Sequence, residues 1–304
     1  MENVSPRPID STAAPFAALV AVQVFFGSLP VIGKVVLQVL PALGLVGFRV
    51  GISATAFSIV QLYRGRFWLK EKGDYWRFAV VSLFGVTFNQ TLFISGLSLT
   101  TASNTSLLAA TIPIFTLAVS SFLGAERLRR AKVMGVFLAF AGVAVLIDPR
   151  KASFSSSSTI GDLLIIANSL SYGIYVASSK SIITRNGAFR SITWVFIFAA
   201  IVCVPLGMFS MRNVDLQSVS STVWLLVLYI GLGATASPYL LNAWALARVS
   251  PSTVAIFVYL QPLIGFLLAV AFLGEIIDIK FAVAASLVFV GVYLTSRRYT
   301  VSET

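Results

Sequence analysis

Apolar residues in this chain come in long runs separated by short polar stretches. A membrane-spanning helix needs roughly 20 mainly apolar residues. Ten windows of about that length occur, at about 14–36, 43–63, 76–97, 102–123, 131–147, 160–180, 191–211, 222–244, 251–273 and 280–296. The pattern therefore predicts an all-helical integral membrane protein with ten transmembrane helices, of which the fifth and tenth are the shortest. The connecting stretches leave no room for a soluble domain.

The second half of the chain repeats the first. A shift of 149 positions superposes four matching pairs: Pro113 on Pro262, Glu126 on Glu275, Ser103 on Ser252 and Gly142 on Gly291. A duplicated block of apolar helices is typical of membrane transporters. We expect residues 1–147 and 160–298 to form two five-helix units, joined by a Ser-rich segment at 148–159.

Basic residues predict the orientation in the membrane. With the N-terminus placed inside, 16 Lys and Arg fall in inside segments and 4 in outside segments. Lys34 and Arg49 lie within expected spans and are not counted. The positive-inside rule then predicts that both termini are cytoplasmic. Because each unit has an odd number of spans, the second enters the membrane from the opposite side. We therefore expect two inverted repeats, an arrangement that permits alternating access around a central site.

Composition narrows the class of protein. The chain is 58% hydrophobic and 11% charged, with a mean hydropathy of +0.92, so it has about half the charge of a soluble domain. The formal net charge of +11 comes mostly from loops and does not indicate nucleic acid. Histidine is absent and Cys203 is the only cysteine, which removes the commonest general base and metal ligands. We expect no enzyme, catalytic residue, metal or cofactor.

Local motifs add a family resemblance. Gly47–Phe48–Arg49 in the second span, and the runs from Pro113 and Pro262 to Glu126 and Glu275, resemble the drug/metabolite transporter superfamily. Within it, they are similar to the EamA-like ten-helix transporters, over residues 14–297. The resemblance implies a cavity lined by helices 1–4 and 6–9, with helices 5 and 10 peripheral. Known members export amino acids and related metabolites, or carry sugar phosphates and nucleotide sugars in organelles.

Arg49 is one candidate for substrate contact. It lies about seven residues into the second span, where a cation costs at least about 2.5–3.5 kcal/mol unless it is paired or hydrated. Its planar guanidinium suits bidentate binding of a carboxylate or phosphate. The alternative is a structural arginine near the outer interface that donates to carbonyls at a helix end.

Polar and aromatic side chains in the expected cavity helices complete the predicted substrate-binding set. Besides Arg49, its members are Asn89, Gln90, Asn168, Tyr172, Tyr175, Tyr239, Trp244, Tyr259 and Gln261, with Gln23 as a similar amide. Amides in membrane helices also bond neighbouring helices, and aromatics also fill cores and interface belts. A structural role is therefore the alternative for each.

Prolines within spans predict hinges. Pro30, Pro113 and Pro262 lack a backbone donor and free the carbonyl four residues earlier, so each marks a gate or, alternatively, a plain kink. Lys34 and Lys180 align near opposite mouths and either attract an anion or snorkel to headgroups. Glu126 is expected in a loop ion pair or cap beside Arg127, Arg129 and Arg130. No Asp or Glu lies deep in an expected span, so we expect no carboxylate proton relay.

These features predict a secondary transporter, an exporter by its resemblance, that acts by alternating access in the cell's inner (plasma) membrane. The scarcity of cations within spans favours an amino acid or a related zwitterionic or amphipathic compound. The alternatives are a sugar-phosphate or nucleotide-sugar exchanger, and a channel or scaffold protein. The expected partners are a small-molecule substrate and the lipid bilayer, with no nucleic acid, and the chain is expected to be a monomer or homodimer.

Overall fold

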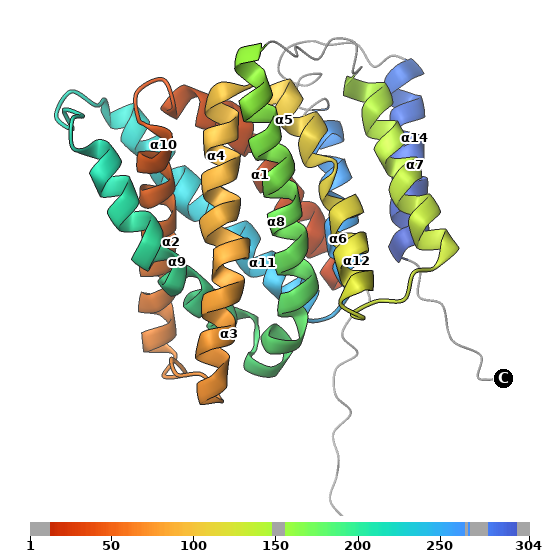
Figure 1. The fold of residues 1–304 in the computed structure, drawn as a ribbon, viewed down its shortest axis with the longest axis horizontal. Coiled ribbons are helices and arrows are strands. Elements are labelled where there is room, and N and C mark those ends of the chain that lie inside the picture. Colours follow the sequence, from red (N-terminus) through yellow and green to blue (C-terminus); the bar gives the residue numbers. More distant parts are fainter. Residues whose placement is uncertain (1–12, 148–155, 265–266, 268–278, 297–304) are drawn as a thin grey trace, which may run out of the picture.

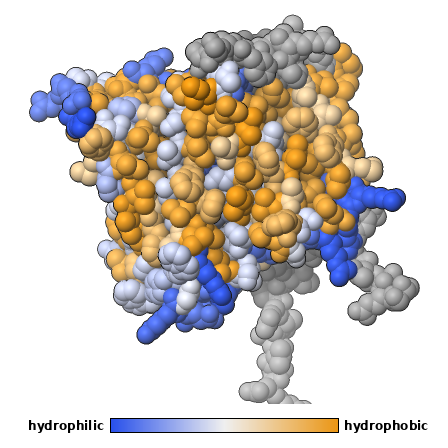
Figure 2. All heavy atoms as spheres, in the orientation of Figure 1, coloured by the Kyte–Doolittle hydropathy of each residue, from blue (hydrophilic) through white to orange (hydrophobic). Residues whose placement is uncertain are grey.

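The molecule is a bundle of helices (Figure 1). The computed structural model describes residues 13–147, 156–264, 267 and 279–296, and within these residues the regular structure is entirely helical. Seven described segments are long and apolar enough to cross a membrane: Ala14–Val36, Ala42–Tyr63, Lys72–Leu99, Asn104–Phe122, Ser158–Asn186, Ala188–Met211 and Ser221–Leu246. Hydrophobic residues cover most of the face seen in Figure 2, with hydrophilic ones at its lower edge and upper left corner. The chain is therefore a multi-pass membrane protein.

Four of the long helices are continuous. α1 (Ala14–Val36), α2 (Ala42–Tyr63) and α9 (Ala188–Met211) match the expected spans to within a few residues. α8 (Ser156–Asn186) is longer than expected at both ends, because its first and last turns are polar and resemble loops in sequence. It begins inside the expected joint at 148–159, whose first part lies outside the described residues. Both termini and Glu275 also lie outside them.

The third and eighth expected spans are each divided by a π-helical turn. The first consists of α3 (Lys72–Ser82), η1 (Leu83–Thr87) and α4 (Phe88–Leu99). The second consists of α10 (Ser221–Gly231), η3 (Leu232–Ala236) and α11 (Ser237–Leu246). The two π-helical segments stand 149 positions apart, which is the shift of the sequence repeat. The two halves therefore share this local backbone geometry as well as the sequence pattern. π-Helical turns are frequent at functional sites.

The fourth and ninth expected spans are interrupted as well. α5 (Ala102–Ala109) ends before α6 (Ile112–Phe122) begins, and α12 (Pro251–Ile256) passes into the 3₁₀ segment η4 (Phe257–Tyr259). Pro113 lies in the first turn of α6, where a missing N–H costs little. This corrects the expectation that Pro113 lies inside a continuous helix. Pro262 follows η4 by three residues, and Pro30 lies inside α1.

α7 (Arg130–Ile147) and α14 (Ile279–Ser296) pack against each other on one side of the bundle (Figure 1, right). Their backbones approach closely, because a Cβ added to Gly142 would lie 2.7 Å from the Ala284 oxygen, and one on Gly291 would lie 2.4 Å from the Gly135 oxygen. As the position rises along α7 it falls along α14, so the helices are antiparallel. A shift of 149 positions exchanges the two contacts, which gives this pair a local two-fold relation.

α2 and α9 form a second close pair. A Cβ on Gly47 would lie 2.8 Å from the Gly207 Cα, and one on Gly51 would lie 3.2 Å from Val204. Gly47 and Gly51 thus let the backbones of α2 and α9 approach closely, as small residues do in membrane helices. This contact fixes α2 and, with it, the position of Arg49.

Candidate substrate site

A small cavity lies between the interrupted helices and α1, α2 and α8. Its volume is about 70 Å³, and its lining consists of Gln23, Phe26, Leu29, Arg49, Asn89, Gln90, Phe93, Ala109, Ile112, Asn168, Tyr172, Tyr239, Val258 and Gln261. Ligand pockets usually measure about 300–1,000 Å³, so in this conformation the cavity has room for only a few water molecules. The structure nevertheless brings together seven of the predicted substrate-binding residues.

Arg49 is buried at the wall of this cavity, with 1% of its surface exposed. Its Nε donates to Thr235 Oγ1 at 3.0 Å, whereas its Nη1 has no hydrogen-bond partner. Thr235 belongs to the π-helical segment η3, so the irregular turn positions the only hydroxyl that binds this guanidinium among the described residues. No Asp or Glu is part of the cavity lining. A buried cation without a counter-charge is costly, so this side chain is suited to an external anion.

Amide and tyrosine side chains form a network beside Arg49. Gln90 Nε2 donates to Tyr239 Oη at 2.6 Å, and this hydroxyl lies 2.9 Å from both Gly85 O and Asn89 Oδ1. Asn168 Nδ2 donates to Asn89 O at 2.8 Å. Gln90 and Tyr239 occupy matching positions of the sequence repeat, 149 residues apart. The repeats therefore meet at this hydrogen bond, as they do at the pair of α7 and α14.

Two further side-chain contacts lie in and beside the cavity. Gln261 Nε2 donates to Gln23 Oε1 at 2.8 Å, which joins the segment after η4 to α1. Asn242 Nδ2 donates to the Tyr172 hydroxyl, and its own Oδ1 has no partner. Asn242 and Thr235 were not predicted. The available signal for Asn242 was its position three residues after Tyr239, on the same face of α11.

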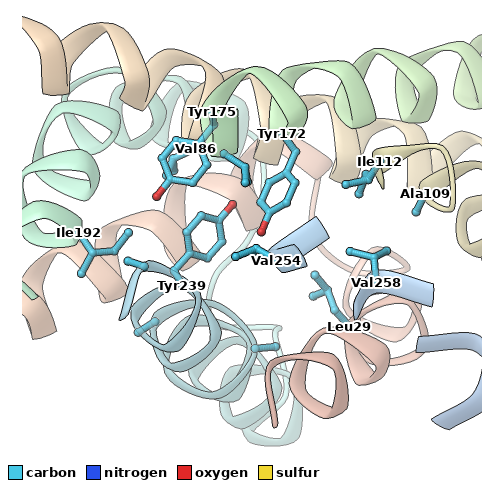
Figure 3. Close-up of a cluster of buried hydrophobic side chains, with 14 of the residues drawn as sticks. Leu29, Val86, Ala109, Ile112, Tyr172, Tyr175, Ile192, Tyr239, Val254 and Val258 are labelled. Atoms are coloured by element: carbon cyan, nitrogen blue, oxygen red, sulfur yellow. The ribbon is translucent and has the colours of Figure 1, made fainter. Parts of the chain in front are cut away.

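The remaining predicted aromatic residues lie outside the cavity lining. Tyr175 packs beside Tyr172 with ring centroids 6.1 Å apart, and Figure 3 shows both extending from α8 towards Tyr239. Trp244 lines a different cavity, with the Arg248 guanidinium carbon 3.9 Å from its ring centroid. Tyr259 is fully buried, and its hydroxyl has no partner.

Buried carboxylates correct one sequence expectation. Asp162 lies seven residues into α8, is 5% exposed, and accepts from Thr100 Oγ1 at 2.6 Å and from Asn104 Nδ2 at 3.3 Å. It lies deeper in its helix than in the expected span at 160–180, because α8 begins at Ser156. Asp74, near the start of α3, is fully buried and accepts from Arg185 and Asn186. Both groups lie outside the central cavity lining.

Glu126 forms the expected ion pair and a cap. Its carboxylate accepts from Lys132 Nζ, and also from the Ser252 N–H at 2.8 Å and the Ser252 hydroxyl at 2.6 Å. The ion-pair partner of Glu126 is therefore Lys132, which follows the three arginines in the sequence. Lys180 donates to Val249 O at 2.6 Å, so its ammonium group is bound to the protein. These contacts tie the end of α6 and α8 to the start of α12.

Comparison with known proteins assigns the family. The model of the EamA-like transporter family matches residues 14–148 and again residues 159–297. An uncharacterized transporter of Archaeoglobus fulgidus is 29% identical, over 75% of this chain and 79% of its own. The uncharacterized transporter YetK of Bacillus subtilis is 23% identical, over 92% and 86%. A WAT1-related protein of Arabidopsis thaliana is 27% identical, over 70% and 65%.

A solved structure supports the fold. The crystal structure of another protein aligns with 94% of this chain and over 96% of its own chain, with a TM-score of 0.76 and 20% sequence identity. At that identity the likeness shows the fold alone. The double match of the family model, the similarity to named transporters and the membrane-spanning helices agree with one another. The chain belongs to the EamA-like transporter family, within the drug/metabolite transporter superfamily.

Proposed function

We propose that this transporter exports a small metabolite that carries a carboxylate, most simply an amino acid or a related zwitterionic or amphipathic compound. The observation that carries the proposal is the buried Arg49, whose Nη1 has no partner in a central cavity. A substrate carboxylate there would supply the missing acceptor and counter-charge. Tyr172, Tyr239 and the surrounding amides would contact the rest of the substrate.

The alternative is a sugar-phosphate or nucleotide-sugar exchanger. A phosphate group with two negative charges favours several cations. The described lining of the cavity holds Arg49 as its single cation, which favours a carboxylate. A channel is disfavoured because the central space has a volume of only about 70 Å³.

The proposed mechanism is alternating access by two inverted five-helix units, with both termini in the cytoplasm and the protein in the plasma membrane. Its supports are the matching π-helical segments and the contacts that the 149-residue shift exchanges. The cavity volume of about 70 Å³ requires the two units to move before a substrate can enter. The interruptions ahead of Pro113 and Pro262 would then act as the hinges.

Counterflow in proteoliposomes tests this function. Vesicles loaded with an unlabelled amino acid should accumulate the labelled compound with saturable kinetics, and Arg49→Gln should abolish the accumulation. Arg212→Gln is a matched control, because Arg212 caps the far end of α9 away from the cavity. Linear, unsaturable entry would instead indicate a channel. A C-terminal reporter that is active only in the periplasm should be silent, and activity would contradict the proposed orientation.

A further inference from the structure

A second, larger cavity opens at one end of the bundle. Its volume is about 620 Å³, and we call it the arginine groove; its lining includes Gln61, Arg64, Arg66, Phe189, Arg190 and Trp244. The groove lies where α2 ends and α9 begins, at the end of the bundle that we expect to face the cytoplasm. Its size is that of a ligand site, and none of its residues lines the central cavity.

Three arginines give the groove a positive charge. Arg190 Nε donates to Arg66 O at 2.9 Å, and the Arg64 guanidinium carbon lies 4.9 Å from the Phe189 ring centroid. These contacts hold the Arg190 and Arg64 side chains at the rim without neutralising them. Among the described residues, none of the three forms an ion pair, and the lining contains no Asp or Glu. The groove therefore attracts an anion, and guanidinium groups bind phosphate with paired donors.

Gln61 adds a second recognition element. Its side chain lines the groove and is 2% exposed, and its Nε2 donates to Arg66 O. That bond fixes which end of the amide is nitrogen, so the acceptor Oε1 remains, buried and without a partner. A buried acceptor left without a donor destabilises the empty protein. A ligand with a hydroxyl close to its anionic group would satisfy it.

The rest of the wall is mainly apolar. Leu240, Leu241 and the body of Trp244 come from α11, Ala14 and Ala18 from α1, and Phe189 from α9. A free polar anion would leave this surface in contact with water, whereas an acyl chain would cover it. The arginines stand at the ends of membrane helices, which is the depth of lipid headgroups.

We propose that the arginine groove binds an anionic phospholipid with a hydroxyl in its headgroup. The phosphodiester contacts the three arginines, the headgroup hydroxyl donates to Gln61 Oε1, and an acyl chain lies along the α1 and α11 side chains. A lipid bound there bridges α2 and α9 and stabilises the pair that positions Arg49. This site is separate from the substrate cavity and does not depend on which substrate is transported.

Native mass spectrometry of the delipidated full-length protein tests the proposal. Short-chain phosphatidylglycerol should bind at least about tenfold more tightly than the phosphatidylcholine of equal chain length. Combined Arg64→Gln, Arg66→Gln and Arg190→Gln should remove that preference. Arg212→Gln is the matched control, because Arg212 also stacks over a phenylalanine, Phe209, at a helix end, with 4.3 Å to the ring centroid. The single variant Arg190→Gln, expected to lose about threefold or more, serves if the triple variant does not fold.

Two further ligands separate the parts of the site. Phosphatidylmethanol has the same charge and no headgroup hydroxyl, so it should bind several-fold more weakly than phosphatidylglycerol, and Gln61→Leu should abolish that difference. Glycerol 3-phosphate should bind at least tenfold more weakly than the lipid. Equal affinity for phosphatidylcholine, a triple variant that behaves like Arg212→Gln, no effect of the hydroxyl, or glycerol 3-phosphate binding as tightly as the lipid would each overturn the proposal.

Discussion

Two buried charges in this molecule stand in opposite surroundings. Asp74 is fully buried, and the protein itself balances it with Arg185, Arg77 and Asn186. Arg49 is buried to the same degree, yet its described partner is a single threonine hydroxyl. A charge that the protein balances stabilises the fold, whereas one that it leaves unbalanced lowers the stability of the empty protein and favours an external counter-ion. The comparison predicts a structural role for Asp74 and supports the proposed substrate-binding role of Arg49.

The largest expected effect is on binding at Arg49. Arg49→Gln should abolish measurable substrate affinity, a loss of more than about 100-fold, because the counter-charge is gone. Arg49→Lys keeps the charge without the bidentate geometry and should weaken binding about tenfold, which is about 1.4 kcal/mol. The melting temperature without substrate should be unchanged or higher in Arg49→Gln. Calorimetry and thermal unfolding on the same preparations measure both quantities; a folded Arg49→Gln protein with intact affinity would remove Arg49 from the site.

Asp74→Asn should give the opposite result. The substitution leaves Arg185 without its main counter-charge and should lower the free energy of unfolding by about 2–3 kcal/mol, with substrate affinity unchanged. Glu71→Gln is the control: Glu71 also pairs with Arg185, at 3.2 Å, but is 56% exposed, so the expected loss is under about 1 kcal/mol. Equal losses in the two variants, measured by thermal unfolding, would contradict the assigned role of burial.

A smaller effect is expected in the network beside Arg49. Tyr239→Phe removes the hydroxyl that joins Gln90 to Gly85 and Asn89. It should weaken substrate affinity several-fold and lower stability by about 1 kcal/mol. Tyr293→Phe, at an exposed position on α14, is the control and should change neither. Wild-type affinity in Tyr239→Phe, from the same calorimetric titration, would confine this network to a structural role.

The smallest effect on stability is expected at the prolines. Pro113→Ala and Pro262→Ala should each slow counterflow several-fold, and the double variant more, while the melting temperature changes little because Pro113 lies in the first turn of its helix. The measurement is the initial counterflow rate per amount of folded protein. Wild-type rates in both single variants would make these residues plain kinks.

Much of the bundle could be predicted from the sequence, because apolar run length and the 149-residue shift act over whole helices. Polar side chains inside apolar spans identified Arg49, Gln90 and Asn168 as lining residues. Which face of a helix an aromatic occupies could not be predicted. Tyr239 and Trp244 are five residues apart, hence about 140° apart around α11, and only Tyr239 reaches the cavity.

The π-helical turns were not predictable either. The five residues of η1 and of η3 have no shared motif that distinguishes them from ordinary helix, and the turns are stabilised by contacts between distant helices. One such contact is the bond from Arg49 to Thr235, across 186 residues of sequence. The early start of α8 was hidden by its Ser-rich first turn, which is why the burial of Asp162 was missed.

The hydrogen bond between Gln90 and Tyr239 has a consequence for how such a protein could have diversified. In an ancestor built from two identical chains with this packing, one position would face its own copy, and any substitution would appear on both sides at once. Fusion of duplicated genes removes that constraint, since each copy then mutates alone. This chain has an amide at one position and a phenol at the other, so a solute bound at its centre would meet different chemical groups at its two ends, which a strictly symmetric ancestor could not offer.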